Sequence, residues 1–470
     1  MPTAGSYSLT IRAQIPATLG LFGRLMAAIG EVGGEVGGVD IVRSTSDAVI
    51  RDITVFARDD EHGEEIRKAI AKRKGVKVLS VSDRVILSHV GGKVGMQNRV
   101  ALETRDDLSM AYTPGVARVC MDIHHEPETV WDYTIKGNSV MVVSDGSSVV
   151  GEGDLGALAS LPAAEAKCMF LREFAGIDGF PLPVTVRDPD DMSRILASVS
   201  SVFAGIHLSD IAAPRCFEIV EKLGRAVDIP VFQDDQEGTA AAVLAGVLNG
   251  LRLAGKRLED SRVVVAGLGP GGTATVRLLV SAAAGDVIAC DSQGAIHAKR
   301  KGMDERLTAI AAMTNLDGVT GNVRKLVKGA DVFVGLSAPD ILTGRDVKQM
   351  AKSPVVFALA LPRPEISARE AIAAGAVYGS GRPDVPNQVN SGIAYPGIWR
   401  GAIDVRATRI NDAMVMAAAG AIAAEVPADA LSPDVVVPSV FNTGLVPAVA
   451  KAVREAAWAT GVARVTPAVD

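Results

Sequence analysis

The chain has 470 residues, of which 48% are hydrophobic, 22% charged and 4% aromatic. This length exceeds what one hydrophobic core usually serves, and the apolar content excludes a disordered chain, so we expect two or three α/β domains. The formal net charge of −6 and the lack of a basic run longer than residues 299–301 exclude a nucleic-acid partner.

The N-terminal residues and the cysteines indicate where the protein works. Residues 1–6 lack the pattern of a signal peptide, and no uncharged apolar run reaches the roughly 18 residues that a membrane span requires. We therefore expect a cytoplasmic protein without a membrane partner. Four widely spaced cysteines in apolar surroundings predict buried, reduced thiols: Cys120, Cys168, Cys216 and Cys290.

The first 85 residues or so alternate strands and helices. Alternating apolar residues predict a strand at 7–15, and apolar residues at helical spacing predict a helix at 21–29. Further strands are predicted at 36–42, 49–57 and 76–81, and a further helix at 64–72. The resulting order βαββαβ is typical of a ferredoxin-like domain, which we assign to residues 1–88. With the turn IPATLG at residues 15–20, this domain resembles the ACT-like regulatory domains of metabolic enzymes, which implies an amino-acid effector.

The rest of the chain predicts two further α/β regions. Short strands alternate with helices from about residue 96, so we assign residues 89–248 to an α/β catalytic domain. The strand-then-helix unit of a parallel sheet repeats from about 262 to 381, and the last ninety residues look mainly helical. Residues 249–470 are therefore expected to form a Rossmann-type NAD-binding domain with C-terminal helices.

A glycine-rich loop marks the expected nucleotide site. A buried strand at 262–266 runs into Gly267, Gly269 and Gly272 at G-x-G-x-x-G spacing, and a helix is expected from 273 to 280. These glycines permit the turn, let the backbone approach a pyrophosphate, and let the helix pack on the strand. Asp291 follows the next strand, where a carboxylate binds the ribose hydroxyls, which favours NAD over NADP. A tight turn without any nucleotide is the alternative.

Five further segments, together with this loop, resemble the malic enzyme family over roughly residues 95–455. They are YTPGVA at 112–117, VSDG at 143–146 with GDLG at 153–156 and Lys167, DIAAPRCFE at 210–218, FQDDQEGTA at 232–240, and PNQVN at 386–390 leading into YPG at 395–397. The resemblance implies NAD-dependent oxidation of malate, or of a malate-like 2-hydroxy acid, at C2. Loss of the β-carboxylate as CO2 and protonation of the enolate would then yield pyruvate.

The resemblance also implies roles for three side chains in proton transfer. Lys167 would accept the hydroxyl proton, provided that burial and a divalent cation lower its pKa. We expect Lys167 on a helix that has Pro162 in its first turn, where proline is tolerated. Tyr112 would protonate the enolate carbon, and Asp234 would belong to the hydrogen-bond network around it. A surface lysine and a buried structural tyrosine are the alternatives.

A hard cation, Mg²⁺ or Mn²⁺, would polarise the C2 carbonyl and hold the enolate oxygen, which requires oxygen ligands. The resemblance assigns Asp210 and Asp235 to two of three carboxylate ligands. The third, a glutamate in family members, is Ser209 here, so we expect weaker metal binding. Adjacent acids that merely cap a helix are the alternative.

The remaining implied contacts concern the cofactor and the substrate. Ser337 would lie at the cofactor, and Leu361, Asn390 and Ser391 would lie at the substrate. Leu361 and Ser391 replace asparagines of the family, so the pocket should accept a bulkier or less polar acid than malate.

Two other functions stay open at this point. One is a diverged enzyme that only dehydrogenates or only decarboxylates a less polar substrate. The other is a catalytically silent regulator that binds a nucleotide and an amino acid. The family resemblance also implies a homo-oligomer, either a dimer or a tetramer.

Overall fold

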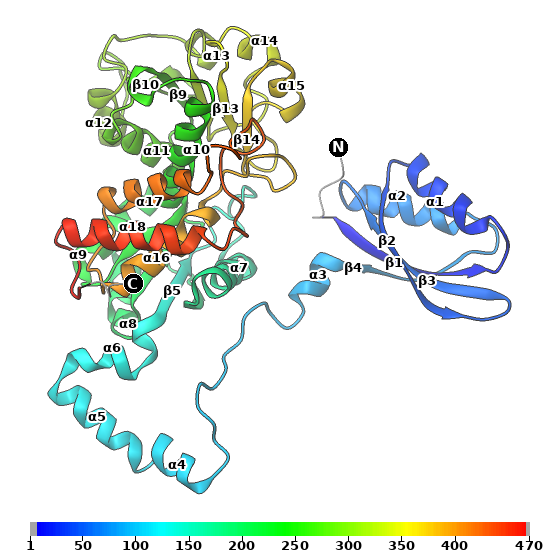
Figure 1. The fold of residues 1–470 in the computed structure, drawn as a ribbon, viewed down its shortest axis with the longest axis horizontal. Coiled ribbons are helices and arrows are strands. Elements are labelled where there is room, and N and C mark those ends of the chain that lie inside the picture. The colour runs from blue at the N-terminus through cyan, green and yellow to red at the C-terminus, as the bar shows by residue number, and fades with distance from the viewer. Residues whose placement is uncertain (1–6, 467–470) are drawn as a thin grey trace. The chain divides into compact units, whose positions relative to one another are not determined.

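The computed structural model describes residues 7–466, and the chain forms two compact units, residues 1–95 and 96–470 (Figure 1). Unit 1 has the βαββαβ order that the sequence predicts. Its elements are β1 (Ser8–Pro16), α1 (Leu21–Glu31), β2 (Glu35–Ser44), β3 (Ala48–Phe56), α2 (Asp60–Ala71) and β4 (Lys77–Asp83), followed by α3 (Arg84–His89).

In unit 1 the strands form one antiparallel sheet in the order β2-β3-β1-β4, as in a ferredoxin-like fold. Ile11, Ala13 and Ile15 of β1 alternate with more exposed residues and pack under α1 and α2. Helix α2 begins four residues earlier than expected, because the Asp59 carboxylate caps it by accepting a hydrogen bond from the His62 backbone N–H at 2.8 Å.

Unit 2 begins with helices α4 and α5 and then builds a parallel sheet in the order β6-β5-β7-β8. Every residue of β5 is buried, as expected for a parallel strand covered on both faces. The elements of this part are α4 (Arg105–Ala111), α5 (Gly115–His125), α6 (Val130–Tyr133), β5 (Ser139–Ser144), α7 (Ala157–Ala175), β6 (Asp178–Pro183), α8 (Pro189–Val199), β7 (Gly205–Leu208), α9 (Arg215–Ala226), β8 (Val231–Gln233) and α10 (Thr239–Leu253).

The second sheet of unit 2 has the order β11-β10-β9-β12-β13-β14, with only β11 antiparallel, and is the predicted Rossmann-type sheet. The predicted strand at 262–266 is β9. The elements are β9 (Arg262–Ala266), α11 (Pro270–Ser281), β10 (Asp286–Asp291), β11 (Gly294–Ala295), α12 (Glu305–Met313), α13 (Val323–Leu326), β12 (Val332–Gly335), α14 (Gly344–Val347), β13 (Val355–Ala358), α15 (Ala368–Ala373) and β14 (Val377–Ser380), then α16 (Tyr395–Asp404), α17 (Asp412–Ala424) and α18 (Leu445–Ala459).

Helix α7 departs from expectation at its start. It begins at Ala157, so Pro162 lies inside the helix and not in its first turn. Proline has no N–H, and one intrahelical hydrogen bond, to the carbonyl of Leu158, is therefore lost. Leu158 is 88% exposed, so water can satisfy its carbonyl at that surface.

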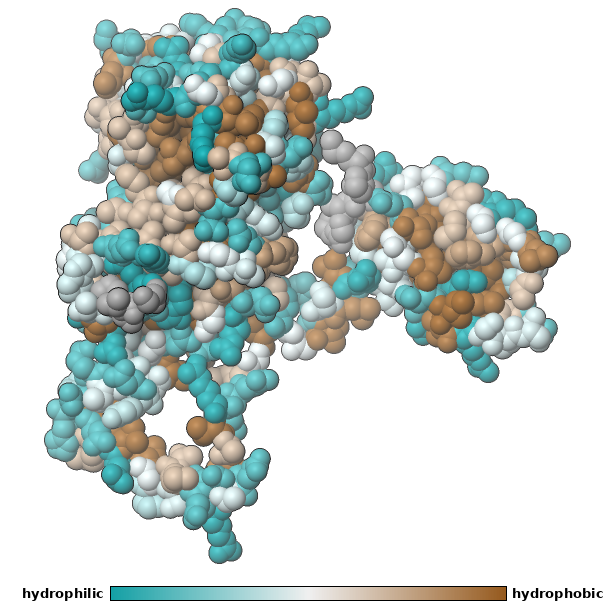
Figure 2. Space-filling view, viewed as in Figure 1, coloured by the Kyte–Doolittle hydropathy of each residue, from teal (hydrophilic) through white to brown (hydrophobic). Residues whose placement is uncertain are grey.

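Helices α4 and α5 form a hairpin without a core of its own. Neither helix has a buried residue; the two helices pack mainly on each other, and α5 also packs on the 3₁₀ turn Pro127–Thr129. Hydrophobic residues are exposed along this segment (Figure 2), among them Met110, Tyr112 and Met121. Cys120 is also exposed here, so the prediction of four buried thiols is wrong for one of them, while the other three cysteines are buried and all four are free.

Among the described residues, no helix has the length and apolar composition needed to cross a bilayer.

Candidate active site

The carboxyl ends of the two parallel sheets of unit 2 border a cavity of about 510 Å³. Loops that follow parallel strands gather at one edge of the sheet, which is where α/β proteins bind ligands. Nine of the predicted site residues line this cavity: Lys167, Asp210, Asp235, Gly269, Gly272, Ser337, Leu361, Asn390 and Ser391.

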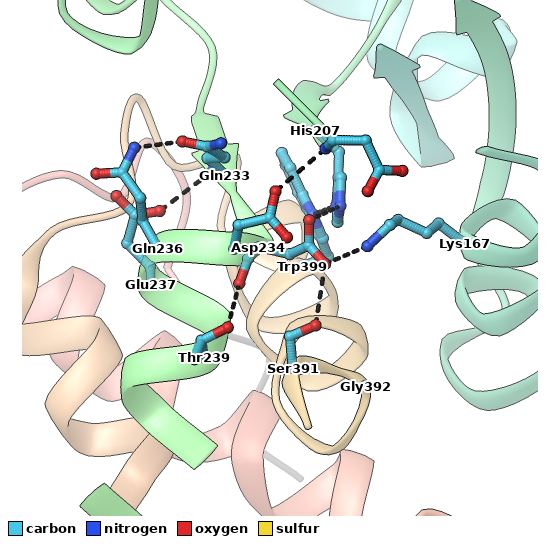
Figure 3. Close-up of polar contacts among 12 residues, drawn as sticks. Lys167, His207, Gln233, Asp234, Gln236, Glu237, Thr239, Ser391, Gly392 and Trp399 are labelled. Carbon is cyan, nitrogen blue, oxygen red and sulfur yellow. Dashed lines mark hydrogen bonds and ion pairs between the residues drawn. The ribbon is translucent and has the colours of Figure 1, made fainter. Parts of the chain in front are cut away.

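Lys167 projects from α7 toward Asp234, which follows β8 in the π-helical turn Asp234–Gly238 (Figure 3). The lysine ammonium donates to Oδ2 of Asp234, and the Ser391 hydroxyl donates to the same oxygen at 2.9 Å. The Asp234 side chain is completely buried, and that of Lys167 is 18% exposed. The buried carboxylate thus holds the ammonium in the cavity wall, and a surface role for Lys167 is excluded.

His207 and Trp399 support Asp234 from the other side (Figure 3). His207 is the second-last residue of β7. Its side chain is fully buried, and its Nε2 lies 3.2 Å from Oδ1 of Asp234. The Trp399 indole donates to Nδ1 of His207 at 3.0 Å. Neither residue is among the sequence-predicted site residues, because no motif links α16 with a strand 192 residues earlier in the chain.

The protein side chains around Lys167 favour its charged form. Burial acts to lower its pKa, but the carboxylates of Asp234, Asp235 and Asp210 outweigh burial and raise the pKa above its ordinary value. The predicted lowering of the pKa includes a divalent cation, and the protein side chains alone do not produce it. Burial opposes ionisation of Asp234 too, but Lys167 and His207 keep the pKa of Asp234 well below its usual range.

Asp210 and Asp235 are the candidate cation ligands. Burial raises the pKa of both, and the neighbouring Asp234 carboxylate helps to raise that of Asp235 to about 7. Oδ2 of Asp210 is buried without a hydrogen-bond partner, while Oδ2 of Asp235 accepts from the Asp210 backbone N–H at 3.1 Å. The buried Asp210 carboxylate, with its unsatisfied oxygen, and the partly buried Asp235 carboxylate fit a hard divalent cation, which would satisfy that oxygen.

The third expected ligand position is occupied by Ser209, which has a neutral hydroxyl in place of a carboxylate. Ser209 is 1% exposed, its hydroxyl has no hydrogen-bond partner, and it does not line the cavity. Within residues 7–466 no three His, Cys, Asp or Glu side chains are grouped to hold a metal. Two acidic side chains are therefore the candidate ligands, and the remaining coordination would have to come from neutral oxygens or the substrate.

The glycine loop has the geometry that its sequence predicts. Gly267 has a φ of 95°, which a residue with a side chain rarely adopts. A Cβ on Gly272 would lie 1.7 Å from the Gly267 carbonyl oxygen, so the start of α11 packs directly on the turn. A Cβ on Gly269 would meet no atom within 4 Å, so the backbone is open to the cavity there. Helix α11 begins at Pro270, three residues before the predicted start.

Ser337 and Leu361 lie on loops after β12 and β13. Glu365, which the sequence patterns did not single out, is completely buried and ties these loops together. Its carboxylate accepts hydrogen bonds from the backbone N–H groups of Ser337 at 2.8 Å and Ala360 at 3.1 Å. Leu361 is 37% exposed in the cavity wall, where it presents an apolar surface.

Asn390 and Ser391 begin the 3₁₀ turn Ser391–Ile393. The Asn390 side-chain oxygen accepts from the Gly392 backbone N–H at 2.8 Å and so caps this turn. The turn carries Ser391 to Asp234, which binds the loop to the lysine pair.

Tyr112 is a predicted site residue that the structure does not bring to the cavity. It follows α4, is 67% exposed, and is absent from the cavity wall. Asp291 ends β10, next to the glycine loop, and its Oδ2 accepts a hydrogen bond from the Arg300 side chain.

The fold and the cavity define a two-sheet α/β protein with a dinucleotide loop beside a buried lysine–carboxylate pair. The malic enzyme N-terminal domain matches residues 92–224, and the malic enzyme NAD binding domain matches residues 236–458. The NAD-dependent malic enzyme of Geobacillus stearothermophilus is 45% identical over 99% of this chain and 97% of its own length. The NADP-dependent malic enzyme of Halomonas elongata is 40% identical over 80% of this chain and 92% of its own.

Among solved structures, the NAD-dependent malic enzyme of Thermotoga maritima has a TM-score of 0.76 and 37% identity, and the match covers 79% of this chain and 99% of that one. The chain belongs to the malic enzyme family.

Proposed function

We propose that the protein catalyses the NAD-dependent oxidative decarboxylation of malate to pyruvate and CO2. The observation that carries this proposal is the single cavity that holds the Lys167–Asp234 pair, the carboxylates of Asp210 and Asp235, and the backbone opening at Gly269. Hydride transfer, proton removal and decarboxylation need a nicotinamide, a base and an electron sink within reach of the same carbon atom. The family relationship to a full-length NAD-dependent malic enzyme supports the same reaction.

The side chains of the site have separate proposed roles. Lys167 takes the proton of the C2 hydroxyl, and Asp234 and Ser391 hold its amine in position. Asp210 and Asp235 would hold Mg²⁺ or Mn²⁺, with Ser209 as a neutral neighbour. The cation, when bound, supplies the positive charge that stabilises the enolate oxygen and opposes protonation of Lys167. The glycine loop would hold the pyrophosphate of NAD, and Ser337, which lines the same cavity, would contact the cofactor.

Tyr112 is the proposed acid that protonates the enolate carbon, and its exposed position supports a homo-oligomeric enzyme. A hairpin without buried residues gains little stability alone, since apolar side chains such as Met110 and Met121 stay in water. We infer that a second copy of the chain covers the hairpin and completes the active site with Tyr112. Because two copies of the chain would cover each other's hairpins, the oligomer would be a dimer or would be built from dimers.

Unit 1 is proposed to be a regulatory, ACT-like domain that binds an amino acid. Its ferredoxin-like sheet and its turn at residues 16–20 support this role. Fold likeness alone does not identify the effector.

A second candidate function is the same chemistry on a less polar 2-hydroxy acid. Leu361 and the alanines at 163 and 166 give the cavity an apolar wall near Lys167, and Lys167 is the one cationic side chain among its lining residues. A second carboxylate on the substrate would thus find no further cationic side chain in the cavity wall to pair with.

One assay distinguishes these functions. The purified full-length protein is incubated with NAD, Mn²⁺ and either malate, 3-alkylmalates or lactate, and NADH and CO2 are both measured. Equal amounts of NADH and CO2 from malate support the proposal, and Lys167→Ala should abolish both products. NADH and CO2 from 3-alkylmalates but not from malate favour the second candidate, whereas NADH from malate without CO2 shows a dehydrogenase that does not decarboxylate. A protein that binds NADH but turns over none of these acids overturns both and leaves the regulator.

A further inference from the structure

The carboxylate of Asp291 lies where the adenosine ribose of a dinucleotide would bind. Asp291 is the last residue of β10, which pairs in parallel with β9, and Cys290 is in register with Ala266. The Gly267 backbone N–H donates to the Cys290 carbonyl at 2.8 Å, so the end of β10 adjoins the glycine loop. In dinucleotide folds a carboxylate in this position accepts hydrogen bonds from the ribose hydroxyls and repels a 2′-phosphate.

This carboxylate is not alone. Its Oδ2 accepts a hydrogen bond from Nη2 of Arg300 at 2.6 Å, and its Oδ1 accepts one from the Gln293 backbone N–H at 2.8 Å. The Arg300 side chain is only 12% exposed. It is fixed further by the Gly294 carbonyl at 3.2 Å and by the Gln293 side-chain oxygen at 3.1 Å.

The pair changes what the ribose position can bind. Arg300 cancels the charge of Asp291, so the repulsion that excludes a 2′-phosphate is weakened. A guanidinium has five N–H groups, and the hydrogen bonds above use three of them. The two others are available to phosphate oxygens, which arginine binds well. Exposed Lys299 and Lys301 add positive charge on either side.

We propose that Arg300 is a cofactor-specificity residue that lets the protein bind NADP as well as NAD, with the ratio of affinities set by the Asp291–Arg300 pair. This inference rests on the nicotinamide dependence in the proposed function. Arg300 favours the cofactor with the 2′-phosphate, whereas Asp291 favours the cofactor with the free hydroxyl. Removing either residue should therefore shift the preference in opposite directions.

Direct binding tests this without turnover. NADH and NADPH are titrated separately into the full-length protein, without malate or metal, and bound cofactor is followed by its fluorescence. We expect dissociation constants within about tenfold of each other for the wild type. Arg300→Gln should shift the ratio toward NADH by on the order of tenfold, and Asp291→Asn should shift it toward NADPH by a similar factor.

Two controls accompany these variants. Arg277→Gln removes a positive charge from a 57% exposed arginine of α11, which follows the glycine loop. This variant should leave the ratio of the NADH and NADPH dissociation constants unchanged. Arg300→Lys keeps the charge but loses the planar fork, and should give an intermediate ratio.

The possible failures are distinguishable. A wild type that binds NADH more than about a hundredfold more tightly than NADPH overturns this inference alone, as do Arg300→Gln and Asp291→Asn variants that shift both cofactors equally. A wild type that binds neither cofactor overturns the proposed function itself.

Discussion

The indole of Trp399 fixes the proton of His207. Because Trp399 Nε1 donates to Nδ1 of the histidine at 3.0 Å, the neutral ring must carry its proton on Nε2, which faces Asp234 at 3.2 Å. The ring is fully buried, and burial lowers the pKa of His207 below its ordinary value, so the neutral ring is favoured. His207 is therefore a positioning residue whose Nε2–H faces one oxygen of Asp234 while Lys167 donates to the other.

A matched pair of variants tests this role. His207→Gln keeps a donor near the position of Nε2 and should retain most of the activity. His207→Leu leaves a buried carboxylate oxygen without a donor, and we expect kcat to fall by roughly tenfold to a hundredfold with a smaller change in KM. Both values come from initial rates with malate and NAD, and equal losses in the two variants would contradict the role.

Ser209→Glu should restore the missing acidic ligand. Without metal, a third buried carboxylate would repel Asp210 and Asp235, and we expect a loss of stability on the order of 3 kcal/mol. With Mn²⁺ present, the variant should bind the ion roughly tenfold more tightly than the wild type. Thermal unfolding with EDTA and with Mn²⁺ measures both effects. Ser209→Gln has the same size without the charge, and a similar gain in Mn²⁺ affinity for it would argue against a ligand role.

Glu237 should make the folded protein less stable as the pH rises. Burial raises the pKa of its carboxyl from 4.5 to about 7. The folded state therefore favours the protonated form, and its stability decreases as the pH rises from about 4.5 through 7. Glu237→Gln removes this effect while its amide oxygen can still accept from the Gln233 backbone N–H, as Oε2 does at 3.2 Å.

For Glu237→Gln we expect a gain in unfolding free energy on the order of 2 kcal/mol at pH 8, and almost none near pH 4.5. Denaturant titrations of both proteins at the two pH values measure it. A gain of equal size at both pH values would show that ionisation is not the cause.

Leu361→Asn tests the apolar wall of the cavity. An amide at this position can donate to a substrate carboxylate, so we expect kcat/KM for malate to rise by roughly tenfold and that for 3-alkylmalates to fall. Leu361→Met keeps an apolar side chain of similar volume and should change neither ratio. A lower kcat/KM for malate in the asparagine variant would show that Leu361 does not contact the malate carboxylates.

The sequence predicted what local patterns encode. The glycine loop follows from three residues at fixed spacing and from the strand before them, and the βαββαβ order of unit 1 follows from apolar periodicity. His207, Trp399 and Glu365 escaped prediction because their partners lie far away in the chain, and a lone histidine, tryptophan or glutamate has no local pattern. The raised pKa of Lys167 among the protein side chains also escaped prediction, because the fold gathers three carboxylates around it from distant parts of the chain.

Helix α10 packs with the cofactor-binding region of the chain. It starts directly after the turn with Asp234 and Asp235, is buried over most of its length, and has Gly246 and Gly250 where side chains would strike Phe357 and Val355 of β13. Its other main packing partners, α11 and α17, also follow it in the chain. A cut after α10 would therefore leave this apolar helix without its cover and expose it to water. Exchange of cofactor modules between relatives would have to carry α10 along with the Rossmann-type sheet.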